Sequence, residues 1–175
     1  MMFLLWVAAM AVLLAVILFA SWGAGGDPIP HTGADDVVDL LLYIQQVCEI
    51  NGVDPLVVMA IIDRESNFEP DETNAATGCA GLMQLHPDTL DWICGRTGCR
   101  YNPYNPRANI AAGVYYLRWL LDRYAGNENM ALLAYAEGHG GAEEMVYRDG
   151  VDPAETWQVR TIWARVERYN AEVCG

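Results

Sequence analysis

The chain has 175 residues, a length typical of one domain with a single hydrophobic core. Its 10 basic residues, all of them Arg, stand against 23 acidic ones, so the formal net charge is -13. Because nucleic-acid binding depends on clustered basic side chains that neutralise phosphates, this balance argues against a nucleic-acid partner. The hydrophobic residues are concentrated in an apolar leader, which precedes a domain of ordinary globular composition.

The first 22 residues predict a membrane-spanning helix, because the only polar side chain between Met1 and Trp22 is Ser21. As a helix this run spans about 33 Å, enough to cross a hydrocarbon core of about 30 Å. A cleaved signal peptide is the alternative, since Ala24–Gly26 offers a weak cleavage site, although no basic residue precedes the apolar run. A buried core helix is a third interpretation. Residues 23–36, rich in Gly and Pro, are expected to form a linker.

Residues 37–171 carry helix signals in regular succession. Asp, Asn or Asx-Pro pairs mark the helix starts, and Gly or Asn follows where the apolar periodicity stops. The helices expected on this basis cover residues 37–50, 55–66, 106–125, 130–136 and 153–169. No convincing alternating pattern of a β-strand appears, so we expect one mainly α domain.

The five cysteines bear on the compartment and on metal binding. Cys94 and Cys99 bracket a turn-rich Gly-Arg-Thr-Gly segment that a disulfide could close, and Cys48 and Cys174 could join the two ends of the domain, which leaves Cys79 over. A disulfide implies an oxidising, extracytoplasmic compartment. Five reduced, buried thiols are the alternative. A zinc site needs more ligands at close spacing, and the three His are scattered, so we expect no metal.

Glu65 stands out among the acidic residues. It falls at the C-terminal end of the helix expected over 55–66, on the same stripe as Val58, Ile61 and Ile62. Desolvation by this apolar stripe and the negative end of the helix dipole both raise the pKa of a carboxyl group, which suits a general acid. Spacing alone also allows an ordinary, partly exposed Glu at a helix end.

The segments around Glu65 resemble a known family. Residues 65–70 (Glu-Ser-Asn-Phe-Glu-Pro) and 78–87 (Gly-Cys-Ala-Gly-Leu-Met-Gln-Leu-His-Pro) are similar to two motifs of the lytic transglycosylases of the soluble-lytic, goose-lysozyme-like type. Three more similar segments follow in the order of the family, at residues 109–121, 134–138 and 153–156. The resemblance implies a mainly α, lysozyme-like transglycosylase domain over residues 37–171, and the apolar run of residues 1–22 predicts one transmembrane helix before it.

The resemblance also implies roles for single residues. Glu65 matches the sole catalytic acid/base of the family, and no cofactor is implied. The residues that match substrate-binding positions are Ser66, Gln84, His86, Tyr135 and Glu155. Glu155 is equally explained as a helix-capping residue. Ala136 stands where the family has an Asn, which removes an amide that would contact the sugar, and Asn74 is only a loose match to a family Ser.

The function implied by the resemblance is cleavage of the β-1,4 bond between N-acetylmuramic acid and N-acetylglucosamine in peptidoglycan. The sugar's own 6-hydroxyl would act as nucleophile and leave 1,6-anhydro-muramic ends, which is consistent with one motif carboxylate rather than two. One alternative is a hydrolytic lysozyme of the same fold that uses Glu137, Asp88 or Asp91 as a second acid. Another is a non-catalytic wall-binding component of a membrane complex.

The expected partners follow from the apolar leader and from the domain that comes after it. The domain would contact peptidoglycan glycan strands, and the N-terminal helix would hold it at the membrane with the catalytic domain on the periplasmic or cell-wall side. Secretion after signal cleavage is the alternative. Envelope-spanning secretion, conjugation or phage machinery are candidate settings, among which the sequence does not choose.

Overall fold

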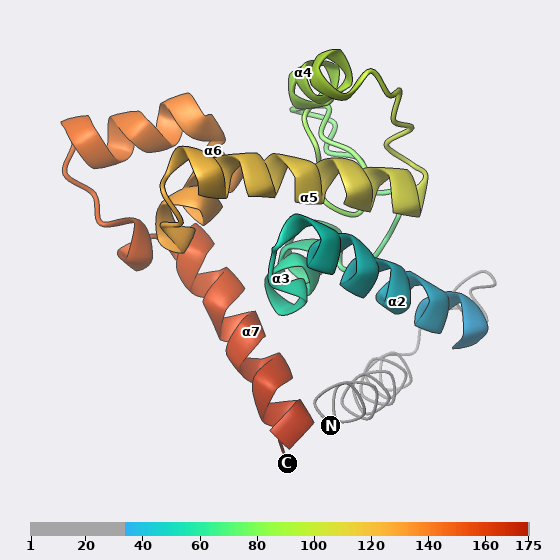
Figure 1. Cartoon of the computed structure of the whole chain (residues 1–175). Coiled ribbons are helices and arrows are strands. Elements are labelled where there is room, and N and C mark those ends of the chain that lie inside the picture. Colours follow the sequence, from blue (N-terminus) through green and yellow to red (C-terminus); the bar gives the residue numbers. More distant parts are fainter. Residues whose placement is uncertain (1–33, 175) are drawn as a thin grey trace.

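The computed structural model describes the backbone of residues 34–174 and the side chains of residues 37–172 (Figure 1). Its elements are α2 (Ala34–Asn51), α3 (Pro55–Ser66), α4 (Pro87–Thr97), α5 (Pro106–Arg123), α6 (Glu128–Glu143), the π-helical turn η1 (Glu144–Arg148), the 3-10 turn η2 (Pro153–Glu155) and α7 (Trp157–Cys174). All of these elements are helical, and the segment between α3 and α4 adds two isolated β-bridges. The predicted mainly α fold is confirmed.

The predicted anchor over residues 1–22 lies outside the described residues. Within residues 34–174, no helix combines the length and the apolar character that a membrane crossing requires. The predicted linker over residues 23–36 is described only at its end, where α2 already begins at Ala34.

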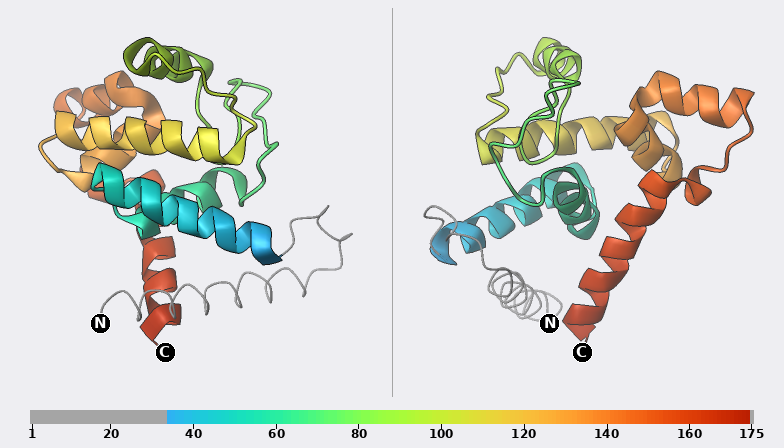
Figure 2. Two further views of the ribbon diagram at one scale, coloured as in Figure 1. Left: turned by 45° about the vertical axis from the view of Figure 1, so that its right-hand side comes forward. Right: turned by 180° about the vertical axis from the view of Figure 1, so that it is seen from behind.

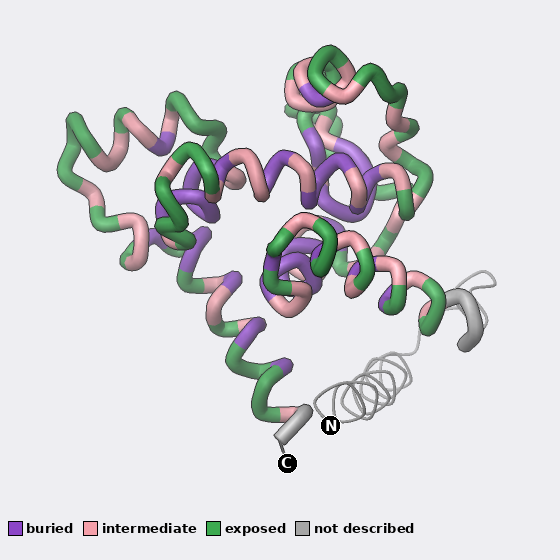
Figure 3. The backbone as a smooth tube through the Cα atoms, in the orientation of Figure 1, coloured by how far each residue is buried: buried purple, intermediate pink, exposed green. Residues whose placement is uncertain are grey.

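The core is built around α3. Six consecutive residues of this helix, from Val57 to Ile62, are buried, and α2 and α7 pack against it from different sides (Figures 1 and 3). α5 packs against α2, α4 and α6 in turn. The segment between α3 and α4 runs beside α5, as two further views show (Figure 2). The C-terminal end of α3, where Glu65 is located, is therefore held between several elements.

An ion-pair cluster fixes α7 to this end of α3. The carboxylate of Asp63 lies 3.2 Å from the guanidinium of Arg165 and 2.6 Å from that of Arg168. It also accepts a hydrogen bond of 2.8 Å from the Tyr169 hydroxyl. Because the Asp63 side chain is only 13% exposed, these partners compensate a carboxylate that has lost most of its hydration.

The segment from Ala80 to Met83 is held by one buried side chain of α5. The Asn109 side-chain oxygen accepts a hydrogen bond of 2.7 Å from the Met83 N–H, and its amide group donates to the carbonyls of Ala80 and Pro103, each at 3.0 Å. Gly81 is required beside it, because its φ is +78° and a Cβ there would lie 2.1 Å from the Pro103 carbonyl oxygen. Loop and helix are thus joined at close range.

The helices differ from the prediction in three places. The last helix was expected to begin at Pro153, but Pro153–Glu155 form the separate turn η2 and α7 begins at Trp157. α4 was not expected, although His86 caps it by accepting from the Asp88 N–H, Pro87 is its first residue, and Gly98 ends it with a φ of +70°. α6 was expected to end before Gly138. Instead, Gly138, with φ 73° and ψ 150°, makes a kink after which the chain returns to helical geometry.

The predicted Cys94–Cys99 disulfide is wrong for this structure, in which both thiols are free. The bracketed segment is the last turn of α4 rather than an open loop, and the Gly98 N–H donates to the Cys94 carbonyl at 2.9 Å. The Cys99 thiol faces the Thr97 carbonyl at 3.7 Å. Cys48 is a free, fully buried thiol in this structure, and the side chain of Cys174, its predicted partner, lies outside the described residues.

These environments predict unequal thiol reactivity. Burial, together with the charge of Asp54, raises the pKa of Cys48 to about 12, so its reactive thiolate is scarce. We expect a maleimide to label exposed Cys99 in the native, unreduced chain at least about 100-fold faster than Cys48. Peptide mapping by mass spectrometry measures both rates. Recovery of a linked Cys94–Cys99 peptide would contradict the assignment.

Candidate active site

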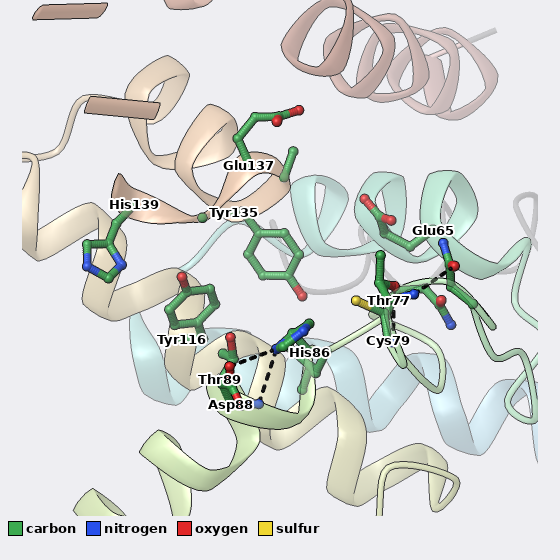
Figure 4. Close-up of a pocket in the computed structure, with 15 residues that line it drawn as sticks. Glu65, Thr77, Cys79, His86, Asp88, Thr89, Tyr116, Tyr135, Glu137 and His139 are labelled. Atoms are coloured by element: carbon green, nitrogen blue, oxygen red, sulfur yellow. Dashed lines mark hydrogen bonds and ion pairs between the residues drawn. The ribbon is translucent and has the colours of Figure 1, made fainter. Parts of the chain in front are cut away.

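A cleft of about 530 Å³ opens beside the C-terminal end of α3 (Figure 4). Its walls come from four parts of the chain: α3, the segment from residue 74 to the start of α4, the middle of α5, and α6 on both sides of its kink. Four of the six predicted site residues line it, namely Glu65, Gln84, His86 and Tyr135. Asn74 and Ala136, where the sequence departs from the family pattern, line it too.

Glu65 projects from the last turn of α3 into this cleft (Figure 4). Its side chain is 21% exposed and forms an ion pair with Arg64. The pKa of Glu65 is raised above the ordinary value, because desolvation by burial outweighs the opposing charges of Arg64 and Arg165. A carboxyl group in this position can hold a proton at a higher pH than an exposed Glu and can release it to a bound ligand.

Tyr135 lies opposite Glu65 on α6, and its phenol points into the cleft (Figure 4). The hydroxyl donates a hydrogen bond of 2.9 Å to the Met83 carbonyl. Burial, and secondarily the negative charge of Glu65, raises the pKa of Tyr135 well above its ordinary value, so the phenol remains protonated. The Tyr116 ring of α5 lies 5.7 Å from the Tyr135 ring and extends the same aromatic wall.

Gln84 and His86 line the cleft from the segment before α4. Gln84 has a positive φ of 45°, and its amide nitrogen donates to the carbonyls of Glu72 at 3.0 Å and Gly81 at 2.9 Å. These bonds engage the amide donors and leave the side-chain oxygen to accept from a ligand. The Nδ1 of His86 accepts a hydrogen bond of 3.2 Å from the Asp88 N–H. The Nε2 on the other edge of the ring is not used by this bond.

Ser66 and Glu155 do not line the cleft. Ser66 is buried, and its hydroxyl lies 2.8 Å from the Leu82 carbonyl and 3.1 Å from the Ile62 carbonyl, so it joins the end of α3 to the segment that carries Gln84. Glu155 is exposed on η2 and pairs with Arg160 at 3.4 Å. The structure thus gives both residues contacts within the protein.

Several lining residues were not predicted as site residues, among them Thr77, Thr89, Tyr116 and His139. Tyr116 was noted only as part of a helix motif, and its place in the cleft depends on how α5 packs against α6. His139 follows directly on the Gly138 kink and contacts Trp119 edge-on at 5.7 Å between ring centroids. The glycine in an apolar helix was the available signal for this kink.

Two of the three acids considered as a second carboxylate line the cleft, and the third does not. Glu137 and Asp88 line the cleft, whereas Asp91 is exposed on α4 and does not. Glu137 accepts a hydrogen bond from the amide of buried Gln158. Among the described residues, no group of three or more His, Cys, Asp or Glu is arranged to hold a metal ion.

A scan against protein families matches the model described as the Transglycosylase SLT domain over residues 42–157. The chain belongs to this family. The match spans α3, the cleft and the start of α7, so it includes each residue discussed above as lining the cleft.

Among curated relatives, a protein named Transglycosylase of Enterobacteria phage PRD1 is 42% identical over 93 residues, covering 53% of this chain and 31% of the relative. The Membrane-bound lytic murein transglycosylase F of Desulfosudis oleivorans is 32% identical over 124 residues, covering 66% of this chain and 26% of the relative. The chain therefore spans about a third or less of the length of these relatives.

Solved structures show the same fold. An inactive mutant of the lytic transglycosylase Slt from Pseudomonas aeruginosa superposes with a TM-score of 0.66 at 20% identity, covering 76% of this chain and 24% of that one. The 70 kDa soluble lytic transglycosylase from Escherichia coli gives a TM-score of 0.62 at 21% identity, with 75% and 23% covered. The lysozyme-like SLT fold expected from the motifs is confirmed.

Proposed function

We propose that this chain is a peptidoglycan lytic transglycosylase in which Glu65 is the catalytic acid/base. The observation that carries the proposal is the placement of Glu65: a desolvated carboxyl group with a raised pKa that faces the cleft of an SLT domain. The substrate is the β-1,4 bond between N-acetylmuramic acid and N-acetylglucosamine. Gln84, His86 and Tyr135 are proposed to contact the glycan, since they line the same cleft.

In the proposed reaction, protonated Glu65 donates its proton to the glycosidic oxygen while the bond from that oxygen to the muramic C1 breaks. The remaining Glu65 carboxylate then removes the proton from the 6-hydroxyl of the same sugar. The 6-oxygen attacks C1 and closes the 1,6-anhydro ring, so no water is consumed. Because the first step needs protonated Glu65, activity is lost as the pH rises through the raised pKa of this residue.

The cellular setting is proposed from the names of the relatives. The relative from Desulfosudis oleivorans and another from Mannheimia succiniciproducens are named membrane-bound lytic murein transglycosylases, which supports a location in the cell envelope. An anchor formed by residues 1–22 would hold the domain there, on the periplasmic or cell-wall side. The relative from phage PRD1 makes phage machinery one of the candidate settings.

Product analysis tests the proposal. Purified peptidoglycan is digested with the full chain, and the released muropeptides are analysed by mass spectrometry. We expect anhydro-muramic ends, which are one water lighter than reducing ends. Reducing ends would instead indicate a hydrolase, for which Glu137 and Asp88 are the candidate second acids in the cleft. No released muropeptides would indicate a non-catalytic wall-binding domain.

A further inference from the structure

Arg64 lies between the proposed catalytic acid and an exposed tryptophan. It directly precedes Glu65 on α3, and its guanidinium group forms an ion pair with the Glu65 carboxylate. The same guanidinium carbon lies 4.9 Å from the ring centroid of Trp157, the first residue of α7. The Arg64 side chain is only 12% exposed, whereas Trp157 is 64% exposed, so the indole covers the arginine from the solvent side.

This arrangement is not required by the helix itself. Successive residues on an α-helix point about 100° apart, so neighbouring side chains do not normally face each other. The Arg64 guanidinium lies over the Trp157 ring while it pairs with Glu65, and a planar guanidinium suits this double contact better than a Lys ammonium does. The contact therefore links α3 and α7 at the proposed reaction centre.

Other charged and titratable groups around Glu65 act differently. Arg165 of α7 is the second cation that acts on this carboxyl, but it also pairs with Asp63. Tyr135 of α6 is a neutral phenol. The remaining titratable groups that line the cleft are Cys79, His86, Asp88, Tyr116, Glu137 and His139. Arg64 is thus the cation in direct contact with Glu65 whose second partner is an aromatic ring rather than an acid.

We propose that Arg64, held by Trp157, is a positioning residue that orients the Glu65 carboxyl and stabilises its charged form. This inference rests on the proposed function and deepens it. The two steps of that reaction place opposite demands on one group, which must first release a proton and then take one up. Burial keeps Glu65 protonated before the first step, and the Arg64 guanidinium stabilises the carboxylate that forms when this proton passes to the glycosidic oxygen.

Direct titration of Glu65 tests the coupling without relying on activity. The full chain is labelled with ¹³C at the Glu carboxyl carbons, and the Glu65 signal is assigned by its absence from Glu65→Gln. We expect Arg64→Gln to raise the pKa of Glu65 by about one unit, and Trp157→Ala to raise it by a smaller amount. Arg64→Lys should lie between Arg64→Gln and wild type, and Trp157→Phe should stay near wild type because a ring remains.

Arg107→Gln is the matched control, because Arg107 also pairs with an acid, Asp39, and stacks on a ring, that of Tyr43 at 5.0 Å, but lies outside the cleft. It should leave the Glu65 titration unchanged. A Glu65 titration in Arg64→Gln that coincides with that of wild type overturns the proposal. If Arg64→Gln does not fold, an unshifted titration in Trp157→Ala overturns it equally.

The pH profile of kcat/KM on peptidoglycan supplies the second readout. In Arg64→Gln its alkaline limb should move upward by the same increment as the Glu65 titration, and kcat should fall because the charged form is less favoured. An unmoved limb beside a shifted titration would refute the role in the reaction. A shifted titration in a chain whose wild type cleaves no glycan would refute the proposed function while supporting the contact between Arg64 and Glu65.

Discussion

Replacing Glu65 by Gln is expected to reduce peptidoglycan cleavage by about 10²–10⁴-fold, the usual loss on removing one acid/base group. Gln keeps the size and hydrogen-bonding reach of Glu but neither donates nor accepts the transferred proton. The helix should persist, because Gln and Glu have similar helix propensities and Glu65 lies in the last turn of α3. Release of soluble muropeptides over time is the measurement, with circular dichroism as the check on folding.

Two further variants serve as comparisons for Glu65→Gln. Glu69→Gln changes an exposed acid that does not line the cleft and should leave the rate near that of wild type. Glu137→Gln changes a second acid within the cleft, and a loss there comparable to that of Glu65→Gln would favour hydrolysis over the transglycosylase mechanism. If Glu65→Gln retains more than about a tenth of the wild-type rate, its assignment as acid/base is wrong.

Replacing Asn109 by Ala is expected to lower the free energy of unfolding by about 3 kcal/mol or more. The side chain is fully buried, and its loss leaves the Met83 N–H and the Pro103 carbonyl without a partner, each at a cost of about 1–3 kcal/mol when buried. The Ala80 carbonyl loses one of two bonds and keeps that from the Leu85 N–H at 3.2 Å. The cavity adds to this loss. Equilibrium denaturation of the full chain, followed by circular dichroism, measures the change.

Asn105→Ala is the matched control on the same helix. Asn105 is the exposed N-cap of α5 and accepts from the Ala108 N–H, so its loss should cost only about 1 kcal/mol. Asn109→Asp is a sharper probe, because it keeps the acceptor for Met83 but turns the amide donor toward two carbonyls into a further acceptor. Equal stabilities of Asn109→Ala and Asn105→Ala would show that the Asn109 network contributes nothing special.

Local sequence signals predicted the bounds of α3 and the position of Glu65 in its last turn. Asp54 caps the helix by accepting from the Leu56 N–H, Pro55 is its first residue, and the apolar stripe places Glu65 against the core. Such features depend on residues within a few positions of one another, and they remain visible in the sequence. The motif resemblance extended this to Gln84, His86 and Tyr135, which line the same cleft as Glu65.

Contacts between distant segments could not be predicted in this way. The Tyr135 hydroxyl bonds the carbonyl of Met83, 52 residues earlier, and Trp157 covers Arg64 from the start of another helix. Both depend on the packing of α6 and α7, which no local pattern fixes. α4 is hard to predict for a different reason: its N-cap is a histidine rather than one of the common Asx or Ser/Thr caps, and the Gly-Arg-Thr-Gly segment at its end is typical of a turn.

The side chains of Asn109 and Asn74 also predict how fast two backbone segments near the cleft exchange amide hydrogens with solvent. The Met83 N–H is bonded to a fully buried side chain, so we expect it to be among the slowly exchanging amides. The exposed amides of Ala76 and Thr77 bond to the side chain of Asn74, and we expect them to exchange through local fluctuations. Deuterium uptake should therefore be slow at Met83 and fast at Thr77, and a glycan bound in the cleft should slow exchange at Thr77, which lines it.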